Sequence, residues 1–153
     1  MCKAKTDHQI IVIRSKAELP DATTTESLTR FLHESLKPYE DDLEDIRRAL
    51  SLALDSPPNR GGLVVLAQDG NTSLGAAVVH FTPWSGYVPE NLLLFVAVDP
   101  DHRGQGLGRA LIERALEECE GDIKLHVEHA NPAKRLYERL GFTSKYAEMR
   151  YTR

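Results

Sequence analysis

The stretch from Asn91 to Cys119 constrains the fold more than any other part of the chain. It consists of an apolar run, NLLLFVAV, a loop, DPDHRGQGLG, and a segment with helical spacing, RALIERALEEC. The first backbone N–H groups of a helix have no partner inside the helix, and the helix dipole places partial positive charge beside them. Glycines let such amides come close to a ligand, because no Cβ stands in the way. The stretch therefore predicts a site for an anion such as a phosphate group.

Periodicity divides the rest of the chain into strands and helices. Short β-branched or alternating runs predict strands, and apolar residues three or four apart predict helices. The turn Asp69–Gly70–Asn71 predicts an antiparallel hairpin, and the strand–helix–strand order after Asn91 predicts a parallel, right-handed crossover. The expected strands are 8–14, 63–68, 74–81, 91–98, 123–128 and 142–152. The expected helices are one that is capped within 23–25 and runs to Leu36, one at about 40–54, one at 107–119, and one at 132–140 with Asn131 as its N-cap.

Length and composition fit one globular domain over residues 1–153, with its core at about 8–152. Hydrophobic residues make up 41% of the 153 and charged residues 27%, which suits a folded rather than a disordered chain. The net charge of −4 argues against nucleic acid as the main partner. The chain has neither a membrane-spanning apolar run nor a signal peptide, and its two cysteines, Cys2 and Cys119, form no disulfide framework. We therefore expect a cytoplasmic protein with no membrane partner.

The glycine turn from Arg103 to Gly108 reads RGQGLG. It is not a dinucleotide fingerprint, because Arg109 stands where that motif needs its third glycine, and it is not a Walker A loop, because no Gly-Lys-Ser/Thr follows. This incomplete fingerprint disfavours a Rossmann-type nucleotide domain. The amides of the turn could still cradle a pyrophosphate, with Arg103 and Arg109 adding charge. On the glycines alone, a plain tight turn before a helix fits equally well.

Two segments carry a family resemblance. VAVDPDHRGQGLGRAL resembles the acyl-CoA signature of the GNAT superfamily of N-acetyltransferases, Arg/Gln-x-x-Gly-x-Gly/Ala, matched here by Arg103, Gly106 and Gly108. NPAKRLYERLGF, residues 131–142, resembles the later helix of that family, and the order of elements agrees from residue 8 onward. The resemblance implies an α/β (α+β) fold with about four helices. Its central mixed, mostly antiparallel sheet would have six to seven strands and a splayed parallel pair.

The resemblance also implies acetyl-CoA as co-substrate, and no cluster of residues has metal-ligand spacing. The strand before the turn would bind the pantetheine amides, and the turn would bind the pyrophosphate. Tyr137 would stand near the sulfur as general acid, although an aromatic residue on the apolar stripe of a helix could equally be core. The residues so implied are Val96, Ala97 and Val98 for pantetheine, Arg103, Gly104, Gln105, Gly106, Leu107, Gly108 and Arg109 for pyrophosphate, and Asn131 and Tyr137 nearer the thioester.

The general base is less well specified. An amine must be neutral to attack a thioester, yet a lysine-like amine titrates at about 10.4, so a base such as a carboxylate is needed. Glu90 lies close to where the family often carries a glutamate, although Leu92 occupies the nearest strand position and Glu90 could be a solvated loop residue. Glu128 and His129 are alternatives.

The expected reaction is direct transfer of an acetyl group from acetyl-CoA to a primary amine within a ternary complex. A backbone N–H, such as that of Val96, would hold the oxyanion. The alternative is an acyl-CoA-binding regulatory module without turnover. The acidic run Glu40–Asp45 could attract a cationic amine or simply be a solvated helix start, and Trp84 and Tyr87 could wall an acceptor pocket. Because about eleven residues follow Gly141, a seventh strand would be absent, short or supplied by another subunit, which makes a homodimer plausible.

Overall fold

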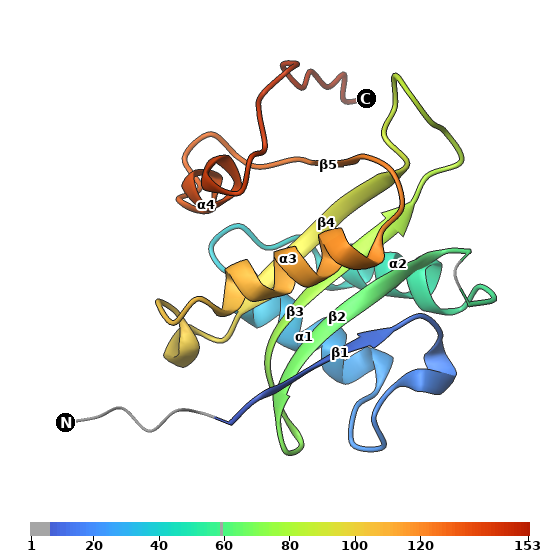
Figure 1. The fold of residues 1–153 in the computed structure, drawn as a ribbon, viewed down its shortest axis with the longest axis vertical. Coiled ribbons are helices and arrows are strands. Elements are labelled where there is room, and N and C mark those ends of the chain that lie inside the picture. Colours follow the sequence, from blue (N-terminus) through green and yellow to red (C-terminus); the bar gives the residue numbers. More distant parts are fainter. Residues whose placement is uncertain (1–6, 59) are drawn as a thin grey trace.

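The computed structural model describes residues 7–58 and 60–153 (Figure 1). Cys2 therefore lies outside the described residues. Five strands, four α-helices and two short 3-10 helices follow one another in the order β1–η1–α1–α2–β2–β3–β4–η2–α3–β5–α4. Their bounds are β1 Gln9–Ile13, η1 Lys16–Glu18, α1 Thr25–Leu36, α2 Leu43–Leu54, β2 Gly62–Asp69, β3 Thr72–Phe81, β4 Asn91–Val98, η2 Pro100–His102, α3 Leu107–Glu118, β5 Ile123–Leu125 and α4 Ala133–Arg139.

The sheet has the strand order β1-β2-β3-β4-β5. The first three pairings are antiparallel, and β4 pairs with β5 in parallel. The predicted hairpin is confirmed, with Gly70 at φ 57° in the turn between β2 and β3. The mixed, mostly antiparallel sheet, the parallel pair and the four α-helices are as expected. The prediction of six to seven strands is wrong, since the described residues form five.

The missing element is the strand expected at 142–152. In the structure the chain after Phe142 has no strand assignment, and Tyr146, Met149 and Tyr151 are exposed. The neighbouring strand β5 is only three residues long, so it offers little backbone for another strand to pair with. The tail therefore has little strand backbone beside it to form a further pairing.

Two further predictions differ by small shifts at helix ends. The second helix begins at Leu43 rather than Glu40, with Asp42 as its N-cap. The last helix begins at Ala133 rather than Pro132, and Asn131 accepts a hydrogen bond from the Ala133 N–H at 2.9 Å. Asn131 therefore satisfies one of the free amides at the helix start, but from one position further out than predicted.

Helices cover both faces of the sheet, with α3 in front and α1 and α2 behind (Figure 1). Leu28, Leu32, Ile46 and Leu50 from α1 and α2 pack with one set of strand residues, including Phe95. The opposite set packs against α3, and the residues that α3 contributes are Leu107, Leu111, Ile112 and Ala115. Alternation of side chains along β2, β3 and β4 supplies both layers, so the sheet is buried on both sides.

The parallel pair separates soon after it forms. β4 and β5 share three residue pairs, of which Leu93 with Leu125 is the last. β4 continues to Val98, while the chain beyond Leu125 leaves the sheet. A shift in the β3–β4 register between Val78 and Val79 lies beside this point. The free edge of β4 after Leu93 therefore faces a gap rather than a strand.

Among the described residues, no helix has the length and hydropathy needed to cross a membrane.

An ion pair ties the end of β1 to the end of α3. Arg14 Nη2 lies 2.7 Å from Glu118 Oε2, and hydrogen bonding to Arg14 lowers the pKa of the Glu118 carboxyl. A lowered acid pKa contributes stability that is present above the unfolded-state pKa and is lost as pH falls through the folded-state value. We expect Glu118→Gln to reduce the free energy of unfolding by about 0.5–1 kcal/mol at pH 7 and by much less at pH 3.

Urea unfolding at the two pH values measures this difference. Glu34→Gln is the matched control, because Glu34 pairs with Lys37 on an exposed surface and its loss should change little at either pH. An equal cost of Glu118→Gln at pH 3 and pH 7 would show that the carboxylate charge is not the cause.

Candidate functional site

The glycine turn between η2 and α3 adopts a conformation that needs glycine. Gly104 and Gly106 have φ values of 74° and 82°, in the left-handed region, and Gly106 is the N-cap of α3. Glycine has no side chain with which to cap the helix, and no side-chain cap is present. None of the backbone N–H groups from Gly104 to Arg109 donates a hydrogen bond within the described part of the chain. The turn thus presents a row of free donors at the positive end of a helix.

The two arginines at this turn have different partners. The Arg103 guanidinium donates from Nη2 to the Ser35 carbonyl at 2.7 Å and from Nε to the Val98 carbonyl at 3.1 Å. Arg109 instead pairs with Glu113 one helical turn later, with Nε 2.8 Å from Oε1, and its side chain is 54% exposed. The expected charge of Arg103 is therefore directed toward backbone carbonyls.

The separated strands form the wall of an open cleft of about 2400 Å³. Val96, Ala97 and Val98, which were implied as the pantetheine-binding backbone, line this cleft together with Gly106, Gly108 and Arg109. Pairing with β3 uses one edge of β4, and the other edge borders the gap. Of the groups on this segment, the Val98 carbonyl is already engaged by Arg103. The strand residues and the glycine turn are therefore brought together along one continuous surface.

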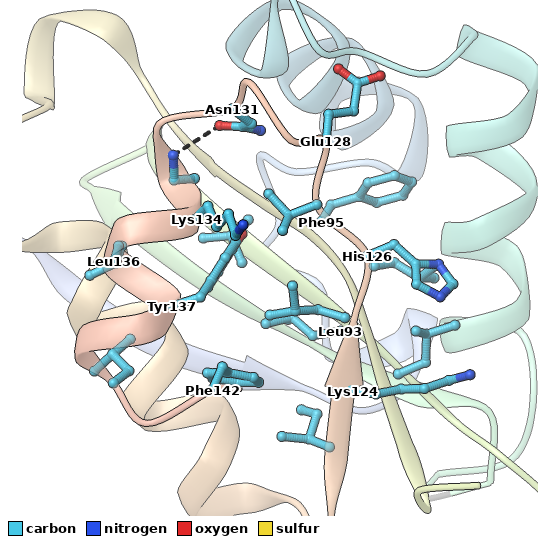
Figure 2. Close-up of a pocket in the computed structure, with 18 of the residues that line it drawn as sticks. Leu93, Phe95, Lys124, His126, Glu128, Asn131, Lys134, Leu136, Tyr137 and Phe142 are labelled. Carbon is cyan, nitrogen blue, oxygen red and sulfur yellow. Dashed lines mark hydrogen bonds between the residues drawn. The ribbon is translucent and has the colours of Figure 1, made fainter. Parts of the chain in front are cut away.

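Tyr137 enters the cleft from α4. Figure 2 shows Tyr137 and Phe142 on the α4 side of the cleft, facing Leu93 and Phe95 of β4. The Tyr137 ring packs edge-to-face on Phe142 at a centroid distance of 5.9 Å, and burial raises the pKa of its hydroxyl. No described residue hydrogen-bonds this hydroxyl. A packed ring with a free, protonated hydroxyl in a cleft suits a hydrogen-bond donor to a bound ligand.

Glu90 lies one residue before β4, at the end where β4 and β5 are still paired, which we call the closed end of the split between the two strands. Its Oε2 accepts a hydrogen bond from the Asp122 N–H at 2.8 Å. Hydrogen bonds from backbone amides, first its own and then that of Asp122, lower the pKa of the Glu90 carboxyl. At this position β4 and β5 are still paired through Asn91 and Ile123, so Glu90 joins the two strands where they are closest.

A polar row lies on the other side of the chain from Tyr137. Lys124 and His126 point away from α4, and Glu128 follows further along the same segment (Figure 2). His126 is the first residue after the last paired residue, Leu125, so it lies where the strands part. The sequence interpretation named Glu128 and His129 but overlooked His126. The alternation of apolar and polar residues over 123–128 was the available signal.

Carboxylates at the start of α2 lie near Glu128. Burial raises the pKa of the Asp41 carboxyl, and nearby Asp45, Asp42 and Glu128 raise it further while Arg150 opposes them. Asp41, Asp45 and Glu128 all line the cleft. Trp84 and Tyr87 are both exposed, and Tyr87 lies at the cleft edge. This side of the cleft is therefore rich in carboxylates, with Arg48 paired to Asp45 and Arg150 near Asp41. Of the two aromatic residues, Tyr87 lines the cleft and Trp84 does not.

Neither a metal centre nor an activated thiol is evident in the part of the chain that the structure describes. No group of three or more His, Cys, Asp or Glu side chains among these residues is placed to hold a metal ion. Burial raises the pKa of Cys119 to about 11, so its thiol stays protonated at neutral pH.

Known proteins share both the sequence pattern and the fold. Residues 60–144, more than half of the chain, match the family model described as "Acetyltransferase (GNAT) domain". Mycothiol acetyltransferase of Thermobispora bispora is 34% identical over 118 residues, 72% of this chain and 39% of that protein. The Escherichia coli K12 [ribosomal protein bS18]-alanine N-acetyltransferase is 42% identical over 67 residues, 40% of this chain and 45% of that protein. The matched stretch thus spans less than half the length of either relative.

A solved structure agrees along the whole described fold. An aminoglycoside N-acetyltransferase in complex with CoA superposes with a TM-score of 0.64 at 16% identity, covering 95% of this chain and 94% of that one. At this identity the likeness shows the fold alone. The family-model match over more than half of the chain establishes that this chain belongs to the GNAT acetyltransferase family.

Proposed function

We propose that the protein transfers an acetyl group from acetyl-CoA directly to a primary amine. The observation that carries this proposal is the row of unpaired amides from Gly104 to Arg109, which continues into the unpaired edge of β4. Coenzyme A has a diphosphate that such amides can bind and a pantetheine arm with two amide groups that an open strand edge can pair with. The solved relative in complex with CoA shares this fold, which supports the assignment.

The parted strands determine where the thioester would lie. A pantetheine arm that runs from the turn along Val98 and Val96 brings its sulfur toward the closed end of the split, near Leu93 and Phe95. Tyr137 faces the same residues from α4 (Figure 2). The acyl group would then lie between the α4 side, where the cofactor enters, and the acidic side near α2. This arrangement gives the amine and the cofactor separate approaches.

The chemistry follows from this placement. The neutral amine attacks the thioester carbonyl, the new C–N bond forms, and a backbone N–H of β4, for which we assign Val96, stabilises the oxyanion. Collapse of the intermediate breaks the C–S bond and releases a thiolate. Tyr137 donates its hydroxyl proton, or a hydrogen bond, to this thiolate, and the proton lost by the amine restores the balance. Because burial raises the pKa of Tyr137, the phenol remains protonated until it is needed.

The proton acceptor for the amine is better sought at the parting of the strands than at Glu90. The Glu90 carboxylate is bound by the Asp122 N–H and has a lowered pKa, which makes it a weak base and a connector of β4 to β5. His126 lies at the split on the acidic side, and Glu128 follows it. An imidazole there can accept a proton from the amine directly or through water. We therefore assign the role to His126, with Glu128 as its neighbour.

The acidic side of the cleft supports a cationic acceptor. Asp41, Asp45 and Glu128 concentrate negative charge where an ammonium group would arrive, and charges of one sign in a cleft raise the local concentration of opposite charges. The amine loses its proton only after arrival, at the base.

Thiol release from acetyl-CoA tests the proposal. The purified protein is incubated with acetyl-CoA and a panel of amines that contains peptides with a free N-terminus, diamines, amino sugars and lysine peptides, with omission of the amine as control. Amine-dependent release of CoA is expected for at least one class. Tight binding of acetyl-CoA with no thiol release from any amine would instead support a regulatory acyl-CoA-binding module.

Tyr137→Phe tests the acid. Removal of the hydroxyl leaves the ring packed on Phe142, so the fold and the CoA affinity should change little. Turnover is expected to fall about 100-fold or more, because general acid–base catalysis typically contributes about 10²- to 10⁴-fold in rate. Steady-state kinetics and calorimetric CoA binding separate the two effects. Tyr146→Phe, which changes an exposed tyrosine in the same way, is the control. Unchanged turnover in Tyr137→Phe would remove its assigned role.

Gly106→Ala tests the turn. An alanine at φ 82° is strained by about 1–2 kcal/mol, so the turn should relax and misdirect its amides. CoA affinity is expected to fall at least about tenfold. Gly70→Ala is the matched control, because Gly70 also has a positive φ, 57°, and open space around its Cβ, but it lies in the turn between β2 and β3. Equal effects of the two substitutions on calorimetric CoA binding would contradict the assignment.

A further inference from the structure

The two arginines of the turn were expected to act together on the diphosphate, but the structure gives them unlike surroundings. Arg103 reaches across to α1 and β4, where both of its hydrogen bonds end on backbone carbonyls. Arg109 stays on the surface of α3 and meets a carboxylate from its own helix. Both arginines are exposed, but the Arg103 guanidinium binds two backbone carbonyls, whereas the Arg109 guanidinium binds one side-chain carboxylate.

We propose that, of the two arginines, Arg109 binds the diphosphate and releases Glu113 when it does so. Arg103 is instead a positioning residue that holds α1 against the turn. This inference rests on the proposed function, because it assigns roles within the same cofactor site. It departs from the sequence interpretation, in which Arg103 and Arg109 both add charge to the pyrophosphate site.

The case for Arg103 begins with the carbonyls that it holds. Ser35 lies in the last turn of α1, where carbonyls have no partner inside the helix, and Ser35 itself is buried. Val98 ends β4. A planar guanidinium can satisfy both carbonyls at once and places its charge at the negative end of the α1 dipole. Turning it toward a phosphate would leave two backbone acceptors without a partner, one of them in a buried region.

The case for Arg109 begins with its position in α3. It is the third residue of the helix, and no acidic residue lies in the first turn. A cation at this position interacts unfavourably with the helix dipole, so helix stability does not explain the presence of Arg109. A bound anion would interact favourably with both the helix N-terminus and the Arg109 side chain. The ion pair of Arg109 with Glu113 is solvent-exposed, and such pairs contribute little to folding stability. Replacing Glu113 by another anion therefore costs little free energy. Phosphate oxygens can accept two parallel hydrogen bonds from a guanidinium, whereas Glu113 accepts one, from Arg109 Nε.

The position of Arg103 also connects the cofactor turn to the acceptor side. The chain that leaves α1 includes Tyr39, whose hydroxyl donates to the Ala130 carbonyl at 3.1 Å, and Asp41, which lines the cleft. The α1–α2 connection is therefore held at one end by Arg103 and further along by the loop before α4. Loss of Arg103 should loosen this wall and raise the KM for the amine as well as for the cofactor.

A truncated donor separates the two roles. Acetyl-pantetheine has the thioester and the amide arm but no diphosphate, so kcat/KM for it is insensitive to any diphosphate ligand. With acetyl-CoA, Arg109→Gln is expected to reduce kcat/KM about tenfold at low salt, and less at high salt, where screening weakens the contact. With acetyl-pantetheine, Arg109→Gln should have no effect. Arg103→Gln should reduce kcat/KM for both donors by similar factors.

Charge-conserving and partner variants sharpen the test. Arg109→Lys should keep most of the CoA affinity, because a lysine ammonium can still bind a phosphate. Arg103→Lys should behave like Arg103→Gln, because lysine lacks the planar guanidinium that donates to two carbonyls at once. Glu113→Gln removes the competing carboxylate and should tighten CoA binding about two- to fivefold. In the ligand-free protein, Arg103→Gln should speed amide hydrogen exchange at the end of α1, while Arg109→Gln should not.

Three results would overturn the proposal: an effect of Arg103→Gln that vanishes with acetyl-pantetheine, an effect of Arg109→Gln that persists with it, or weaker CoA binding in Glu113→Gln. These results differ from failure of the proposed function, in which the wild-type protein itself neither binds CoA nor releases thiol. The hydrogen-exchange comparison needs no ligand, so it tests the Arg103 clamp in either case.

Discussion

Backbone amides that have no partner in the chain are the constraint around which this structure is arranged. A folded protein satisfies nearly all of its buried polar backbone groups, so a continuous run of free donors at a helix start and an open strand edge beside it is unusual. Here the glycines at 104 and 106 direct the donors outward, and the parting of β4 from β5 after Leu93 exposes the edge. One long ligand that carries a diphosphate at one end and amides along its length, as in the proposed function, would satisfy both features together.

The remaining elements hold these two features in place. Helices α1 and α2 pack on one face of the sheet and α3 on the other, which fixes the turn at the end of β4. Arg103 ties α1 to the same point, and Glu90 closes the strands at the opposite end of the split. The cleft is thus open over a defined length, with Tyr137 facing it from α4 (Figure 2). Asp41 and Asp45 on the α2 side also line it.

Much of this could be predicted from the sequence, because the decisive signals are local. The glycine pattern at 103–108 fixed the turn, the 3.6-residue period fixed the helices, and the order of elements fixed the parallel crossover. The side-chain partners of Arg103 could not be predicted, since Ser35 is 68 residues away and nothing local links them. The base that we propose at His126 was not anticipated, because its place at the parting of the strands depends on where β5 stops pairing. The tail at 142–152 was wrongly predicted as a strand, because its sequence does not reveal that the neighbouring strand is only three residues long.

Backbone NMR of the labelled protein during titration with CoA tests the central claim most directly, because it observes the donors themselves. The account predicts saturable shifts that are largest for the amides of residues 105–109, with a second group at 96–98, and small shifts in β1 and β2. Saturable binding whose largest shifts lie elsewhere, with residues 105–109 unchanged, would contradict it.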